Sequence, residues 1–284
     1  MYLDTPRRLK VRILDSDRSE GSQEIQGVQF CDANTKRRIV SYDVFRGFLL
    51  VAMIIFHVLA NLTDLVFDQR IFYWVPMGFI FFLGIVLSSF LKNKKKKKFI
   101  LGAKLFGVFI LLNVHHFVQN ELSFGMLLMG DSLKTSFEIL LPMSLMIFLS
   151  LFFDQFLKQW KFLFALAFFS LVLLNGFHFY SYNLCFLIYG LLGYFLGFGV
   201  DLDEMTKRWM SLKSIFVVLG VCYAVFLSIY FFDFRDFFVL FQVLAFYVLS
   251  TAFFKNSDFL RFLGRNSFPL YIGHIFLIKL LTFL

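Results

Sequence analysis

The sequence predicts an all-α fold, a polytopic bundle of about nine to ten transmembrane helices whose N-terminus lies in the cytoplasm. Two observations lead to this prediction. Of the 284 residues, 59% are hydrophobic and 17% are charged, which is too apolar for a chain with a single water-covered surface. Several apolar stretches also reach or approach the roughly 20 residues that an α-helix needs to cross a bilayer.

Nine apolar segments account for these predicted helices. They cover residues 43–63, 71–91, 99–118, 135–153, 161–176, 182–199, 212–232, 237–254 and 267–284. The fifth is short for a membrane span. The first 36 residues are polar and lack the basic-then-apolar order of a cleavable signal peptide. We therefore expect a mobile polar tail at 1–36 and one transmembrane domain at 37–284.

The distribution of basic residues predicts the orientation of the helices. With nine spans, one side of the membrane holds only Arg70, Lys134 and Arg235 between its helices. The other side holds 14 basic residues: Lys92, Lys94 to Lys98, Lys158, Lys161, Lys207, Arg208, Lys213, Lys255, Arg261 and Arg265. Because loops rich in lysine and arginine stay in the cytoplasm, the second side is predicted to be cytoplasmic. The C-terminus is then external.

Several classes of protein are excluded by the charge distribution, by the cysteine spacing and by motifs that the sequence lacks. The net charge of +9 comes from residues between apolar runs, so it indicates topology and anionic lipid rather than nucleic acid. Cys31, Cys185 and Cys222 have the spacing of neither a disulfide framework nor a zinc site, and we expect no metal. The chain has no Walker loop, no G-x-S-x-G and no H-E-x-x-H.

A polar stripe runs along the first predicted helix. At about 100° per residue, Asp43, Arg46, His57 and Asn61 fall within about an 80° sector. Arg46 and His57 are roughly 16 Å apart along the axis, which places them toward opposite membrane surfaces. Charged and ionisable residues inside a membrane are costly and usually functional. A simpler alternative is an Asp43–Arg46 pair at the helix start, with an inert, hydrogen-bonded His57.

Further histidines lie near the ends of other predicted helices. His115 and His116 end the third one, where a doublet is typical either of a solvated helix end or of a catalytic pair. Neighbouring rings on a helix point about 100° apart, which disfavours a shared metal. In the last helix, Tyr271 and His274 share a face at i, i+3, for which a helix-to-helix hydrogen bond is the alternative role.

Residues 119–138 fit neither a loop nor a membrane span. Their short apolar run, Ser123 to Gly130, is followed at once by Asp131, Lys134 and Glu138. Such a segment indicates a broken or re-entrant helix beside a cavity, or a helix lying at the outer interface.

The motifs at the two ends of the chain together resemble the membrane acyltransferase superfamily. The first motif consists of Arg38, Ser41, Asp43, Arg46-Gly47 and His57. The second consists of Leu263-Gly264-Arg265-Asn266-Ser267, Leu270-Tyr271 and His274. Between them, Gly78 to Gly84 and Ser123 to Leu127 are similar to further family elements. The likeness spans residues 37–284 and extends to acyltransferase-3 proteins and to heparan-alpha-glucosaminide N-acetyltransferase-like proteins.

This resemblance implies an enzyme of a bacterial cytoplasmic membrane. It would move an acetyl or other acyl group from cytoplasmic acyl-CoA to a hydroxyl or amine of an extracytoplasmic saccharide or envelope glycan. His57, Arg46 and Asp43 would be catalytic. The residues that would bind substrate are Arg38, Asn61, His115, His116, Tyr271 and His274. Membrane lipids and a second copy of the chain are compatible partners. The chain is short for this superfamily, because it has nine predicted spans where members often have ten or eleven. A transporter or lipid-handling protein without chemistry is the alternative.

Overall fold

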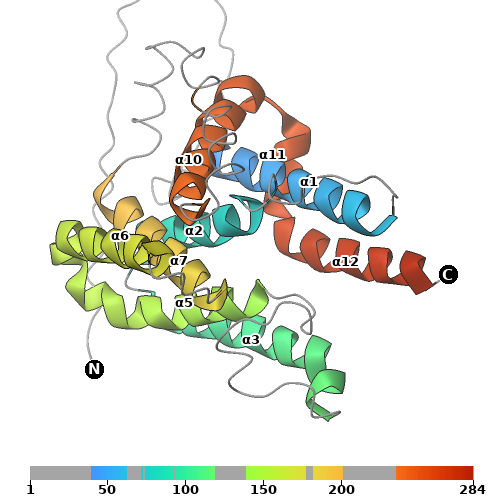
Figure 1. The fold of residues 1–284 in the computed structure, drawn as a ribbon, viewed down its shortest axis with the longest axis horizontal. Helices are drawn as coiled ribbons and strands as arrows, with labels where there is room; N and C mark the ends of the chain where they lie inside the picture. The colour runs from blue at the N-terminus through green and yellow to red at the C-terminus, as the bar shows by residue number, and fades with distance from the viewer. Residues whose placement is uncertain are drawn as a thin grey trace, which may run out of the picture. The chain divides into compact units, whose positions relative to one another are not determined.

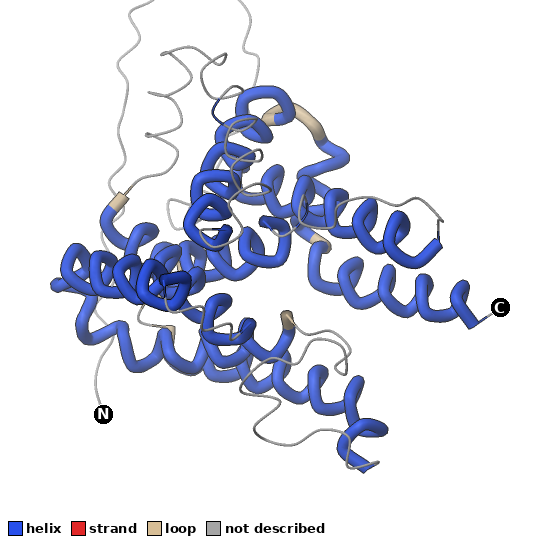
Figure 2. The backbone as a smooth tube through the Cα atoms, viewed as in Figure 1, coloured by secondary structure: helices blue, strands red, loops and turns tan. Residues whose placement is uncertain are grey.

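The computed structural model describes residues 40–62, 72, 74–92, 94–118, 139–176, 182–200, 220 and 235–283. All of them belong to one compact unit, residues 39–284. Every regular element in these ranges is helical, which confirms the prediction of an all-α fold for the described part of the chain (Figure 2). The predicted tail at 1–36, the segment at 119–138 and, apart from residue 220, the predicted span at 212–232 lie outside the described residues.

The described helices coincide with eight of the nine predicted segments (Figure 1). They are α1 (Val40–Leu62), α2 (Trp74–Ser89), α3 (Lys95–Val118), α5 (Leu140–Phe153), the 3-10 helix η2 (Asp154–Gln159), α6 (Trp160–Gly176), α7 (Tyr182–Gly199), α10 (Arg235–Phe254), α11 (Asp258–Arg265) and α12 (Ser267–Phe283). The short helix α11 was not predicted. It begins at a local signal, because the side chain of Ser257 accepts a hydrogen bond from the backbone N–H of Leu260 at 3.2 Å.

Within the described ranges, two helical stretches are long and apolar enough to cross a membrane. One is Val40–Leu59 in α1, and the other is Leu140–Leu174, which runs through α5, η2 and α6. Three shorter apolar helices cover Trp74–Ser89, Asn183–Gly199 and Val239–Phe254. By length and composition, these helices are therefore compatible with a membrane environment.

The packing of α2 against α7 depends on glycines on both helices. A Cβ atom at Gly84 would overlap the carbonyl oxygen of Gly190, and one at Gly193 would overlap that of Phe81. Small residues of this kind allow two helix backbones to approach closely, as they do in membrane proteins. The close approach places α7 beside α2, and α6 packs against α7 in turn.

Aromatic side chains fix α1 against α2 and α10. The ring of Phe45 lies 4.4 Å from that of Phe82, and Phe82 lies 4.9 Å from Tyr247. Trp74 stacks on Phe246 at 4.1 Å. Pairs at these separations add attraction beyond the burial of their area. This cluster anchors the first half of α1 and thereby positions the motif residues on its other faces.

Four buried serine hydroxyl groups are satisfied within their own helices. Ser88, Ser144, Ser150 and Ser250 each donate to the carbonyl oxygen three residues earlier, at 2.7 to 3.1 Å. Such back-bonding lets a polar side chain enter an apolar environment without a partner on another helix. These serines therefore need no functional explanation.

Some helices expose apolar faces. Along α6 the exposed side chains are Phe162, Leu166, Phe169 and Leu173, at the i, i+4, i+7 and i+11 spacing of one helix face. Along α3 they include Phe99, Phe106, Leu111 and Val118. A soluble monomer rarely exposes apolar area of this extent.

Candidate functional site

The motifs from the two ends of the chain meet where α1 crosses α11. A Cβ atom at Gly47 would overlap the carbonyl oxygen of Leu260, and one at Gly264 would overlap that of Asp43. Both glycines are therefore required by the close approach of the two backbones. Gly47 belongs to the first motif and Gly264 to the second, which explains physically why each motif contains a glycine beside an arginine.

A charged cluster forms at this crossing. The Asp43 carboxylate is nearly buried and lies 3.8 Å from the Arg46 guanidinium and 3.7 Å from that of Arg265. Arg46 also donates a hydrogen bond to the hydroxyl oxygen of Ser267 at 2.7 Å. The Asp43–Arg46 pair expected as an alternative therefore exists, but a second arginine and Ser267 join it.

Both arginine side chains of this cluster are partly exposed to solvent. The Arg46 side chain is 33% exposed and the Arg265 side chain 54% exposed. Each guanidinium carries five N–H donors, so both are able to bind phosphate or carboxylate while they neutralise Asp43. Arg265 was not among the predicted site residues, although it stands in the closing motif next to Gly264.

We predict that Arg46→Lys lowers the interaction energy between residue 46 and Ser267 by about 1 kcal/mol. The reason is that a lysine ammonium group lacks the planar fork with which Arg46 contacts Asp43 and Ser267 together. The measurement is a double-mutant cycle with Ser267→Ala, in which the stability of each variant is determined by thermal unfolding in detergent. Arg261→Lys is the matched control, since Arg261 bonds to Asp258 and the Lys255 carbonyl instead. Its effect should simply add to that of Ser267→Ala. Additive effects for Arg46→Lys would contradict the prediction.

A pair of histidines lies between α1 and α12. The rings of His57 on α1 and His274 on α12 have centroids 5.4 Å apart, and Tyr271 contacts His274 edge to face at 5.5 Å. His57 and His274 are 217 residues apart in the chain, so only the packing of α1 against α12 brings them together. In the described ranges no group of three His, Cys, Asp or Glu side chains is arranged to hold a metal.

From Asp43 to His57, the polar stripe of α1 faces protein. Leu50 and Met53, which belong to the same sector as Arg46 and His57, are buried, whereas Ile55 is exposed. The Arg46–Ser267 and His57–His274 contacts also show that α1 and α12 run in the same direction (Figure 1). The stripe is thus an internal seam with a charged cluster at one end and two imidazoles at the other.

The remaining predicted site residues are placed only in part. Arg38 lies outside the described residues. Asn61 lies in the last turn of α1, and His115 and His116 lie in α3, but the described side chains do not include theirs. Ser41, from the first motif, has a structural contact, since its hydroxyl oxygen is 3.2 Å from that of Tyr247.

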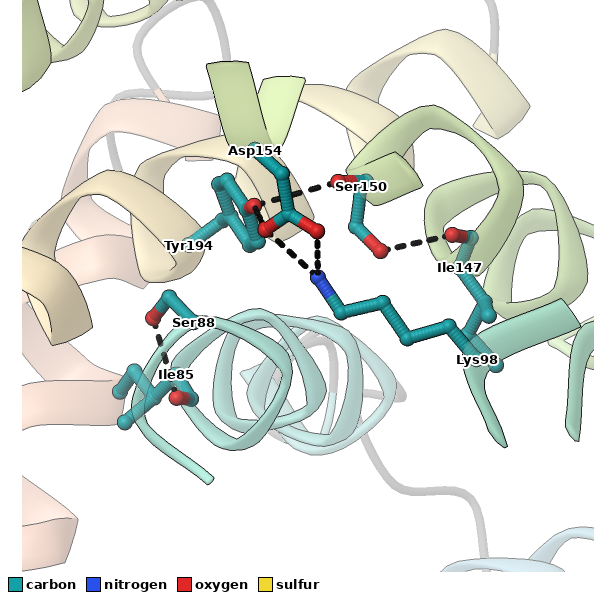
Figure 3. A network of polar contacts seen from close by, with 7 residues as sticks. All are labelled: Ile85, Ser88, Lys98, Ile147, Ser150, Asp154 and Tyr194. Carbon is teal, nitrogen blue, oxygen red and sulfur yellow. Dashed lines mark hydrogen bonds and ion pairs between the residues drawn. The ribbon is translucent and has the colours of Figure 1, made fainter. Parts of the chain in front are cut away.

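A buried ion pair joins α3, η2 and α7 and was missed in the sequence. The Lys98 ammonium is fully buried and donates to both Asp154 carboxylate oxygens, at 2.8 and 2.9 Å (Figure 3). The Tyr194 hydroxyl donates to the same carboxylate at 2.6 Å and lies 3.2 Å from the carbonyl oxygen of Ser150. In the sequence, Lys98 stands with five other lysines in a predicted cytoplasmic loop, and no signal sets it apart.

Burial and pairing act on Lys98 in opposite directions. Burial lowers the pKa of the Lys98 ammonium, while the hydrogen bond and charge of Asp154 act to raise it. Helix α3 begins four residues before the predicted span 99–118, and this extension gives Lys98 the helical position from which it reaches Asp154. The ion pair can stabilise the helix bundle, or a proton can pass between Lys98 and Asp154.

Comparisons with known proteins add no relative. No family model matches the chain, and neither the curated proteins nor the solved structures contain a match.

Proposed function

We propose that the chain is an integral membrane acyltransferase, which moves an acetyl or other acyl group from acyl-CoA to a hydroxyl or amine of a saccharide or envelope glycan. The observation that carries the proposal is the meeting of His57 and His274 between α1 and α12. Ionisable side chains in apolar helices are costly and are usually retained for function. Imidazole is also the side chain most often used for proton transfer near neutral pH.

The proposed setting is a multi-pass arrangement of residues 37–284 in a bacterial cytoplasmic membrane. The two candidate spans and the exposed apolar faces of α3 and α6 support it. Because α1 and α12 run in the same direction, both would cross from the cytoplasm outward, which requires an odd number of spans such as nine. Arg46 then lies toward the cytoplasmic donor, and His57 toward the external acceptor.

The residues of the seam divide into two roles. Arg46 and Arg265, held by Asp43, would bind the phosphates of acyl-CoA or stabilise charge on the thioester oxygen, with Arg38 near them. His57 would act as the general base on the acceptor or carry the acyl group transiently. Tyr271 and His274 would support it, and Asn61, His115 and His116 would contact the acceptor. The proposal needs no metal.

The test is acyl transfer by the purified protein in liposomes, supplied with radiolabelled acetyl-CoA and an envelope polysaccharide fraction. We expect His57→Ala to lower the rate by about 10²- to 10⁴-fold, the usual contribution of a positioned acid or base. Ile55→Ala is the matched control, because Ile55 lies on the exposed face of the same helix. It should leave the rate unchanged.

Three outcomes decide between the alternatives. Transfer that disappears in His57→Ala alone supports the proposal. Undiminished transfer in that variant removes His57 from the reaction. A wild-type protein that neither binds acyl-CoA nor transfers its acyl group overturns the proposed activity.

The buried Lys98–Asp154 pair favours a second candidate, a transporter without acyl chemistry. Paired ionisable residues between membrane helices often mark a proton or substrate pathway. Substrate uptake into liposomes that survives His57→Ala but is lost in Asp154→Asn would support this alternative. Acyl transfer that survives Asp154→Asn in a folded protein would count against it.

A further inference from the structure

The hydrogen bonding of His274 fixes which of its ring nitrogens carries a proton. Its Nδ1 atom lies 3.2 Å from the carbonyl oxygen of Leu270, one turn earlier on α12. A carbonyl oxygen only accepts hydrogen bonds, so Nδ1 must be the donor. In the neutral ring, the Nε2 atom therefore carries the lone pair.

This Nε2 atom is buried and has no hydrogen-bond partner among the described residues. Buried polar atoms are nearly always paired, so an unpaired acceptor calls for an explanation. Asn113 avoids such an unpaired atom on its donor side by bonding within its own helix, to the Phe109 carbonyl at 2.9 Å. His274 makes the equivalent bond with Nδ1 and still leaves a bare lone pair on a ring that lies beside that of His57.

We propose that Nε2 of His274 is the atom that accepts the proton of the acyl acceptor, so that His274 is the general base and not merely a supporting group. The inference rests on the proposed acyltransferase function. It gives His274, on α12, the base role that the proposed function first assigns to His57, and His57, on α1, then orients the acceptor or holds the thioester oxygen.

The reaction balances with no further reagent. As the acceptor oxygen or nitrogen attacks the thioester carbonyl carbon, its proton passes to Nε2 and a carbon–oxygen or carbon–nitrogen bond forms. The carbon–sulfur bond then breaks, and the coenzyme A thiolate takes the proton from Nε2. His274 returns to its neutral form with Nδ1 still bonded to Leu270. The Nδ1 bond holds the ring in one orientation throughout.

The sharpest variant is His274→Asn. An asparagine retains a donor for the carbonyl one turn earlier, as Asn113 and Asn266 show in this chain, but it has no basic nitrogen. We expect kcat to fall at least about 100-fold while the KM for acyl-CoA changes less than about threefold, and added imidazole to restore part of the rate. Gly273→Ala is the control, because a Cβ there meets open space and the rate should not change.

The outcomes separate this inference from the proposed function. An active wild type with a His274→Asn rate within about threefold of it overturns the base role and leaves the acyltransferase proposal intact. A loss that imidazole does not rescue, or that appears mainly in KM, assigns His274 a structural role and also overturns it. An inactive wild type overturns the proposed function itself. If His274→Asn does not fold, His274→Gln is measured in the same way, and failure of both to fold overturns the inference.

Discussion

Asp154→Leu is expected to destabilise the protein by about 3–5 kcal/mol, the largest effect on stability that we predict. The substitution removes both acceptors of the fully buried Lys98 ammonium and leaves an uncompensated charge between α3 and α7. Tyr194 also loses the acceptor of its shortest hydrogen bond. The measurement is thermal or chemical unfolding of the purified protein in detergent, followed by tryptophan fluorescence.

Two further variants make this prediction specific to the pair. The double variant Lys98→Met with Asp154→Leu removes both charges, so it should recover most of the lost stability. Lys97→Met is the matched control, because Lys97 lies in the same helical turn with an exposed side chain and should change stability by less than about 0.5 kcal/mol. Equal losses in Asp154→Leu and in the double variant would show that the charge of Lys98 is not the cause.

Gly264→Ala is expected to destabilise the protein by about 1–3 kcal/mol, the usual cost of overpacking, and, under the proposed function, to weaken the binding of acyl-CoA. A Cβ at this position overlaps the backbone carbonyl oxygen of Asp43, which cannot rotate away as a side chain would. Helix α11 must then shift away from α1, and this shift carries Arg265 away from Asp43. Unfolding in detergent and binding of acyl-CoA to the same sample check the two parts.

The control for this prediction is Gly107→Ala. Gly107 lies in α3, and a Cβ atom there would meet no heavy atom within 4 Å, so alanine should be neutral or stabilise the helix by up to about 1 kcal/mol. A stability loss in Gly107→Ala equal to that in Gly264→Ala would attribute the effect to glycine replacement in general. The close crossing of α1 and α11 would then lose its assigned importance.

The helix positions could be predicted well because their causes are local. Long apolar runs set where a helix forms, and the helices at 74–89 and 182–199 agree with their predicted segments within a few positions. The short helix α11 was missed because its sequence is too polar to stand out as a span. Its start signal, Ser257 followed by Asp258, lies in a stretch whose charge pattern indicates only a basic loop.

The candidate site could be predicted only in part. His57, Arg46 and Asp43 stand out because charged and ionisable residues are unexpected in an apolar run, and the closing motif points to His274. The structure added their contacts: Arg46 with Ser267, and His57 with His274. Arg265 is visible in the motif, but its proximity to Asp43 is not.

The sequence by itself determined the helical class, the membrane-compatible apolarity and the polar stripe of α1. These properties depend on composition and on a period of about 3.6 residues, which neighbouring residues encode. Only the tertiary structure decided which polar groups meet. Lys98 is 56 residues from Asp154, and Arg46 is 221 residues from Ser267, so their pairing depends on which helices pack together. Glycine contacts and aromatic clusters govern that packing. They join segments that are far apart in the sequence, so a local sequence pattern does not predict which segments meet.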